Sequence, residues 1–220
     1  MRKMIIILDI AALLLAGFVV YAIMQGWVGI TTDNRLRDRY RGDIAQVTSS
    51  VDKDNDGIDD QTDILQSVLA YVATKPEYKS QYYDGGYPDD GYGVCTDVVA
   101  QGLLGAGYDL QKLVDEDIRA DMGAYRLDRA DPNIDFRRVR NLKVFFEHTA
   151  ISLTTDVNEI EEWQGGDIVV FEKHVGIVTD RRNARGVPYV IHHYGPLQRR
   201  YEQDILEKRT DIVGHFRISD

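Results

Sequence analysis

The chain has 220 residues, of which 44% are hydrophobic and 28% charged, with a formal net charge of −10 and a pI near 5.0. This acidic balance argues against nucleic acid as a partner, because phosphate backbones are met by clustered Lys and Arg. The single cysteine, Cys95, excludes an internal disulfide and any zinc site built from several thiolates. The length suits one globular domain with an additional segment, and nothing in it fixes the oligomeric state.

Residues 1–30 are predicted to form a membrane anchor. Arg2 and Lys3 precede a stretch in which Asp9 is the only charged residue up to position 30. About 20 apolar residues cross a bilayer. Basic residues before such a span predict a single-pass protein with the rest of the chain outside the cytoplasm. The alternative is a signal peptide cleaved after the small residue Ala22, and both interpretations export residues 31–220.

The rest of the chain is predicted to contain helices first and strands later. Residues 31–51 are polar and are expected to form a stalk. Helical spacing of apolar residues then predicts helices within 61–76, from Cys95 onward and at 141–149. Beyond Gly166, short β-branched runs predict strands at "GDIVVF", "HVGIVTD", "PYVIHH" and "IVGHFRIS". This order indicates an α+β domain over 52–220 with an antiparallel sheet.

An acidic loop, residues 52–63 ("DKDNDGIDDQTD"), opens the domain. Alternating carboxylates followed by a glycine are typical of calcium loops, in which oxygens surround a hard cation. The expected ligands are the side chains of Asp52, Asp54, Asp56 and Asp63 and the carbonyl of Ile58. The ion would be structural. The alternative is an acidic helix cap, because Asp59, Asp60 and Asp63 all suit a helix N-terminus.

Cys95 is predicted to occupy the first turn of its helix. Free backbone N–H groups and the helix dipole there favour a thiolate. Asp97 opposes the thiolate, unless its carboxylate is occupied in capping the helix. The alternative is a buried structural cysteine, since free cysteine is among the most buried residue types.

Two of the five histidines are predicted to lie side by side. A hairpin centred near Asn183 places His174 opposite His192, on the same face of the sheet. His193 would then point to the other face, and His148 and His215 are interpreted as ordinary helix-end and strand residues. A zinc site made of Cys95, His174, His192 and His193 is disfavoured because adjacent strand residues diverge.

The stretches "GYGVCTDVV" and "GDIVVFEKHVGIVTD…YVIH" resemble the NlpC-type cell-wall peptidases, which are papain-like cysteine amidases. The segments "ADPNIDFRRVRNLKVFFE" and "IVGHFRI" are similar to a bacterial subfamily of that clan known as a domain of unknown function. The resemblance covers roughly residues 52–220. It implies a Cys-bearing helix packed on an antiparallel sheet, with Cys95, His174 and His192 as nucleophile, base and orienting residue.

The resemblance also implies the activity. Cys95 would attack an amide or peptide carbonyl in peptidoglycan, with no cofactor needed for catalysis. Tyr92, three residues before the cysteine, is a candidate to line the substrate site. One alternative is a non-catalytic, calcium-stabilised module that binds the cell wall or a partner protein. Another is acyl transfer to an acceptor other than water.

Overall fold

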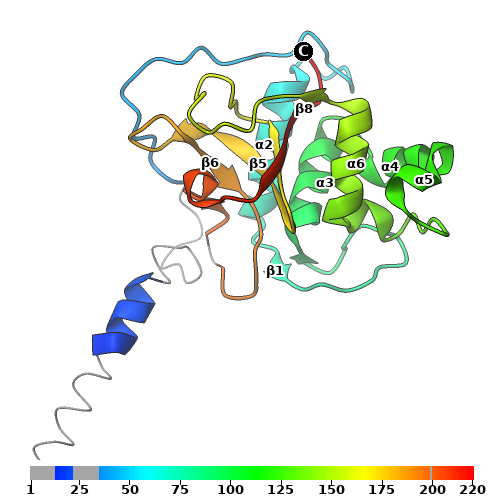
Figure 1. The fold of residues 1–220 in the computed structure, drawn as a ribbon, viewed down its shortest axis with the longest axis horizontal. Helices are drawn as coiled ribbons and strands as arrows, with labels where there is room; N and C mark the ends of the chain where they lie inside the picture. The colour runs from blue at the N-terminus through cyan, green and yellow to red at the C-terminus, as the bar shows by residue number, and fades with distance from the viewer. Residues whose placement is uncertain (1–12, 22–34, 199) are drawn as a thin grey trace, which may run out of the picture.

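The structure is a computed structural model that describes residues 13–21, 35–198 and 200–220. Figure 1 shows a domain of helices and strands, with residues 13–21 forming a separate helical segment. Apolar side chains of that segment are exposed, including Leu13 and Phe18. In the part of the chain that is described, no helix is long and apolar enough to cross a membrane. The rest of the anchor predicted at 1–30 lies outside the described residues.

The three predicted helices are present. The first, α2 (Asp60–Ala73), has Asp59 as its N-cap, whose side chain accepts the Thr62 N–H at 3.2 Å. The second, α3 (Cys95–Gly105), begins at the cysteine and packs against α2. The third is α6 (Val139–Thr149). The sequence reasoning did not predict the other helical elements: α4 (Leu110–Ala120), α5 (Met122–Tyr125), η1 (Asp135–Arg137) and η2 (Leu206–Lys208).

The strands confirm a mixed α+β fold with an antiparallel sheet. All neighbouring strands of the main six-stranded sheet are antiparallel, in the order β3-β8-β4-β5-β6-β7. Its strands are β3 (Ile151–Ser152), β4 (Ile168–Phe171), β5 (His174–Arg182), β6 (Pro188–Ile191), β7 (Glu202–Gln203) and β8 (Ile212–Arg217). A short parallel pair, β1 (Glu77–Tyr78) with β2 (Tyr92–Gly93), precedes α3.

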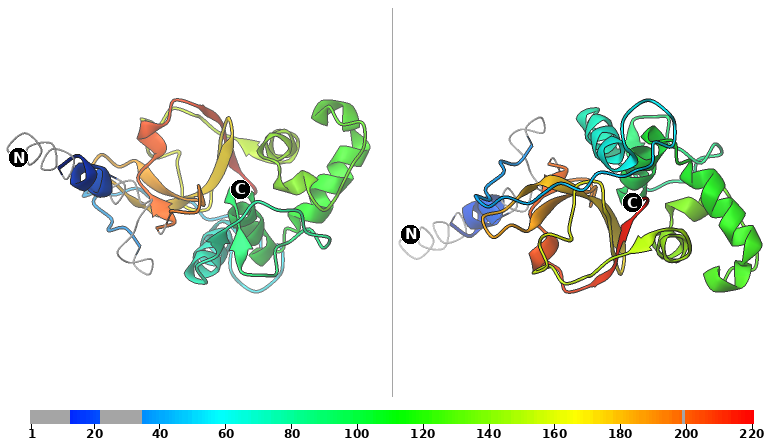
Figure 2. Two further views of the ribbon diagram at one scale, coloured as in Figure 1. Left: turned by 90° about the horizontal axis from the view of Figure 1, so that it is seen from below. Right: turned by 90° about the horizontal axis from the view of Figure 1, so that it is seen from above.

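The curved sheet separates two hydrophobic cores (Figure 2). Alternation along β5 divides its side chains: Val175 and Ile177 join the larger core with the helices, whereas Val178 joins the smaller one around Trp163. Each fully buried aliphatic side chain contributes about 1.5–3 kcal/mol. The N-terminus of α3 is therefore held against β5, the strand on which His174 lies.

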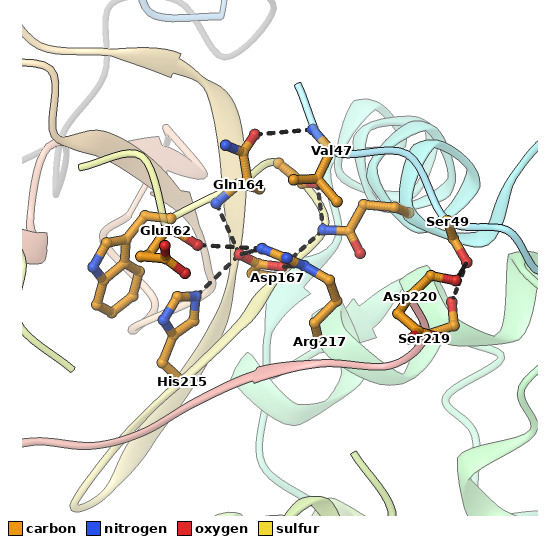
Figure 3. A network of polar contacts seen from close by, with 12 residues as sticks. Val47, Ser49, Glu162, Gln164, Asp167, His215, Arg217, Ser219 and Asp220 are labelled. Atoms are coloured by element: carbon orange, nitrogen blue, oxygen red, sulfur yellow. Dashed lines mark hydrogen bonds and ion pairs between the residues drawn. The ribbon is translucent and has the colours of Figure 1, made fainter. Parts of the chain in front are cut away.

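A buried carboxylate joins α2, β4 and β8 (Figure 3). Asp167 is fully buried and accepts hydrogen bonds from Gln61 Nε2 at 2.8 Å and the Gln164 N–H at 2.8 Å. Arg217 donates to both of its oxygens at 2.8 and 2.9 Å, and His215 Nε2 lies 3.0 Å away. The aspartate of the "GDIVVF" segment thus ties one helix to two strands, a role that the sequence reasoning did not predict.

Residues 35–50 lie extended along the domain (Figure 1). Near the start of this segment, Arg35 forms an ion pair with Glu202, with 2.7 Å between Nη2 and Oε1. The Ser49 and Ser219 hydroxyls are 2.7 Å apart near its end (Figure 3). The described part of the predicted stalk is therefore attached to the domain along its length.

Candidate functional site

Cys95 begins α3, as predicted, and is half-buried. Its pKa is raised to about 11, chiefly by burial, with a further contribution from Asp97. The backbone N–H groups of Val175, Thr96 and Cys95 itself act in the opposite direction. The expectation that the helix start would favour a thiolate is therefore wrong for the free protein. The free-energy cost of burying a thiolate is larger than its stabilisation by the helix N-terminus.

The Asp97 carboxylate is occupied, as a reactive Cys95 requires. Its Oδ2 accepts the Val94 N–H at 2.8 Å, which caps the helix. Arg137 binds both of its oxygens, with Nε to Oδ1 at 2.6 Å and Nη2 to Oδ2 at 2.9 Å. No sequence signal pointed to Arg137, which lies about 40 residues away in the chain.

His174 and His192 come together, but through a different strand register from the predicted one. Val178 pairs with Val190, whereas the hairpin centred near Asn183 would pair it with residue 188. The offset is two residues, and the register shifts again between Val178 and Arg182. An even offset keeps every side chain on its predicted face. His174 Nε2 accordingly lies 2.9 Å from His192 Nδ1.

Gly176, between these strands, permits the close approach. A Cβ atom at this position would lie 2.7 Å from the Ile191 carbonyl oxygen and 3.2 Å from the His192 Cβ. Any other residue would push β6 away from β5. The glycine in "HVGIV" therefore helps to bring the two imidazoles together.

A chain of hydrogen bonds fixes the tautomers of both rings. Gln203 Nε2 donates to the Arg200 carbonyl at 3.0 Å, so its Oε1 faces His192 Nε2 at 3.2 Å as an acceptor. His192 must therefore carry its proton on Nε2, and its Nδ1 accepts the proton of His174 Nε2. This leaves a lone pair on Nδ1 of His174, which is the state required of a general base. Gln203 is a further site residue that the sequence reasoning missed.

Burial keeps the histidines neutral. The pKa of His174 is lowered to about 4, first by burial and then by Arg209. The pKa of His192 is also lowered, by burial and by His174. Burial lowers the pKa of His193 to about 4. A neutral imidazole can accept a proton from the thiol, so the resting site holds a neutral Cys95 and a neutral His174.

Acidification from pH 7.5 to 4.5 is expected to destabilise the domain. His174 and His193 have a pKa near 4 when folded and about 6.5 when unfolded, so only the unfolded chain binds protons in this window. The contribution of each neutral histidine to the free energy of unfolding is fully present above about pH 6.5. It is lost as the pH falls towards 4, by at most about 3 kcal/mol per group. Urea titrations at several pH values measure this slope. His193→Gln should reduce it, and a slope equal to that of wild type would contradict the assignment.

His193 points away from His192, as predicted. Its ring packs between those of Tyr78 and Tyr201, each with its centroid 5.2 Å away. These three residues line a cavity of about 390 Å³. The pKa of Tyr78 is raised by burial and, to a smaller extent, by the charge of Cys95.

Tyr92, the residue predicted to bind substrate, lies in β2 and is half-buried. The Lys79 ammonium lies 4.7 Å from its ring centroid and covers one face of the ring. Glu77 is the partner of Tyr92 across the short parallel pair, whereas Tyr78 pairs with Gly93 and is the tyrosine whose pKa responds to Cys95. The substrate role of Tyr92 stays a prediction, and Tyr78 is an additional candidate.

The acidic loop brings three of its predicted ligands together. Carboxylate oxygens of Asp52, Asp54 and Asp56 lie within 4.8 Å of one another. Gly57, with a φ of +94°, provides the turn, and its N–H donates to Asp52 Oδ2 at 2.9 Å. Asp54 and Asp56 contribute to the raised pKa of Asp63, after burial.

The other groups of the loop have mixed roles. The Ile58 N–H donates to Asp56 at 2.8 Å, and its carbonyl remains only a predicted ligand. Asp59 caps α2, so the helix-cap interpretation holds for that residue while the three clustered carboxylates stay available. Oxygen donors at this spacing suit Ca²⁺.

The remaining histidines lie where they were expected. His148, in the last turn of α6, binds Asp117 at 2.8 Å. His215, in β8, binds Asp167 and stacks on Trp163 with ring centroids 3.7 Å apart. Because His193 points away from His192, the residues considered for zinc do not form a common cluster within the described ranges.

The comparisons with known proteins give a family without an assigned activity. A domain of unknown function (DUF1287) matches residues 65–218. The chain is 38% identical over 161 residues to the uncharacterized protein YijF of Escherichia coli (strain K12), and the match covers 69% of this chain and 77% of that protein. No solved structure matches the chain. The protein belongs to the DUF1287 family.

Proposed function

We propose that this protein is an exported cysteine hydrolase that cleaves an amide or peptide bond in peptidoglycan. The observation that carries the proposal is the hydrogen-bonded pair His174–His192, with 2.9 Å between Nε2 and Nδ1, on the strand that packs against the helix begun by Cys95. The imidazole pair is buried, and the strand that His174 begins contacts the helix that Cys95 begins. An imidazole within reach of the thiol accepts its proton in nucleophilic catalysis.

The arrangement supports a papain-like assignment for the fold. The helix that begins at the nucleophile packs against an antiparallel sheet, the base begins one strand, and its orienting partner follows the next strand. These are the features for which the sequence resembles the NlpC-type peptidases. The peptidoglycan substrate and the membrane anchor at residues 1–30 are proposed from the resemblance and from the apolar N-terminus.

The proposed reaction proceeds through a thioester. Cys95 Sγ attacks the carbonyl carbon as its proton passes to Nδ1 of His174. The backbone N–H of Cys95 is a candidate donor to the oxyanion. His174 then protonates the leaving amine, and the C–N bond breaks. Water, deprotonated by His174, hydrolyses the thioester and regenerates the thiol. His192 and Gln203 keep His174 in the correct tautomer throughout.

The test uses purified full-length protein and isolated peptidoglycan sacculi. Mass spectrometry of the released fragments should show cleavage with the addition of one water per broken bond. Products joined to an amine acceptor instead would indicate acyl transfer. Cys95→Ala should be inactive and equally stable. The proposal fails if wild-type protein leaves sacculi intact and cells carrying Cys95→Ala are indistinguishable from wild type.

A second function is favoured by the burial of the thiol. A partly buried cysteine with a raised pKa suits a non-catalytic module that binds the cell wall or a partner. Alkylation separates the two functions. Slow but measurable modification of folded protein supports catalysis, whereas modification that occurs only after unfolding supports a binding module.

We further propose that the acidic loop binds a structural Ca²⁺ ion. Calcium at 10 mM should raise the melting temperature, because a ligand present at about 100 times its Kd stabilises the folded state by about 2.7 kcal/mol. Magnesium should do less, since it demands a tighter octahedral site. Thermal denaturation with each ion and with a chelator measures the difference.

Asp54→Asn provides a sharp control. The asparagine Oδ1 can still accept the Asp56 N–H, 3.2 Å away, but the charge is lost. This variant should be slightly more stable than wild type in chelator, because repulsion falls, and should lose the response to calcium. Asp84→Asn, at an exposed position outside the loop, should behave like wild type. An unaltered calcium response in Asp54→Asn would contradict the site.

A further inference from the structure

A buried ion pair that the proposed reaction does not use lies at the first turn of α3. The Asp97 and Arg137 side chains are 0% and 2% exposed and form a two-point ion pair. Arg137 also donates from Nη1 to the Gln81 carbonyl at 2.7 Å and lies 4.9 Å from the Tyr83 ring centroid. These contacts hold the guanidinium in one place.

This pair lies next to the thiol. Asp97 is two residues beyond Cys95 in the same helical turn, and its charge acts against ionisation of the sulfur. The η1 segment that carries Arg137 is also bonded to this turn through Thr96, whose hydroxyl donates to the Arg137 carbonyl at 3.3 Å. A buried carboxylate without a partner so close to the sulfur would strongly oppose a thiolate.

We propose that Arg137 is a positioning residue for Cys95: its guanidinium offsets part of the Asp97 charge and fixes the first turn of α3, so that the thiol can release its proton to His174. This role rests on the proposed function, in which Cys95 is the nucleophile. The property by which it is tested is only the ionisation of the sulfur.

The other groups near this turn do not provide this compensation. On β5, His174 is neutral and the Val175 N–H donates to the sulfur, and on β1 the pKa of Tyr78 is raised by burial and by Cys95, so that it is neutral as well. Tyr71 of α2 lies near the pair and has a raised pKa, so it is also neutral. Among the described groups around the sulfur, Arg137 is thus the cation that acts on Asp97.

The test is the pH dependence of iodoacetamide alkylation of the full chain, in which Cys95 is the only thiol. Arg137→Met leaves Asp97 uncompensated and should slow alkylation at pH 8 by about tenfold, one pKa unit. Asp97→Asn leaves Arg137 uncompensated and should accelerate it severalfold. The double variant should return close to the wild-type profile.

Changes of the alkylation rate in opposite directions in the two single variants distinguish a positioning role from a merely structural one. If the pair served only to hold the fold, both single variants would loosen the turn, expose the sulfur and accelerate alkylation together. That result, or an unchanged profile in Arg137→Met, would overturn the proposal. Should Arg137→Met fail to fold, Arg137→Gln takes its place, and alkylation of that folded variant no slower than wild type contradicts the proposal. The readout needs no substrate, so it stands whether or not sacculi are cleaved.

Discussion

Replacing His174 with alanine is expected to slow amide cleavage by ~10²–10⁴-fold, because the thiol then has no group to accept its proton. Cys95 is neutral in the resting protein, so the reaction depends on this transfer more than it would with a preformed thiolate. The rate is measured on sacculi at saturating and limiting substrate. The loss should fall on kcat, with little change in KM, because His174 acts on the sulfur and not on the substrate chain.

The orienting residues should show a graded effect. His192→Ala removes the acceptor of the His174 Nε2 proton and is expected to slow cleavage by up to about 10⁴-fold, as loss of the third member of a triad does. Gln203 bonds His192 and does not contact His174 directly, so Gln203→Leu should slow cleavage by only about tenfold.

His193→Ala is the matched control for His192→Ala. It makes the same change one residue along the chain, on the other side of the strand, and should leave kcat within about threefold of wild type, a change near the thermal energy. Equal losses at His192 and His193 would show that the 2.9 Å contact has no part in the reaction.

Asp167→Ala is expected to destabilise the domain by about 3–5 kcal/mol, the typical cost of breaking a buried ion pair. The substitution leaves Arg217, His215 and Gln61 in the interior without their common acceptor. Because the stability of a domain is only about 5–15 kcal/mol, this loss is a large share of the total. Urea denaturation at pH 7.5 measures it.

Asp180→Ala is the surface control for this prediction. Its carboxylate pairs with Arg35 and is 31% exposed, so its loss should cost less than about 1 kcal/mol. Asp167→Asn should lie between the two, since the amide keeps the size of the side chain but presents N–H groups to donors. A cost at Asp167 no larger than at Asp180 would show that the network in Figure 3 is not important for stability.

Local patterns determined most of the fold. Helical spacing correctly predicted α2, α3 and α6, and alternating β-branched runs predicted β4, β5, β6 and β8. Helix α4 was missed although it is amphipathic and begins after a capping aspartate, Asp109. The two-residue strands β3 and β7 have no periodicity to recognise, and they form only because a longer strand lies beside them.

The sequence by itself determined that Cys95 begins a helix and that His174 and His192 share one face of the sheet. Both conclusions depend on periodicity, which survives a register error of two residues. Only the tertiary structure decided the protonation of the thiol, the tautomers set through Gln203, and the partners of Asp97 and Asp167. These depend on burial and on contacts between residues far apart in the chain. No local pattern encodes how much water a group loses when the chain folds.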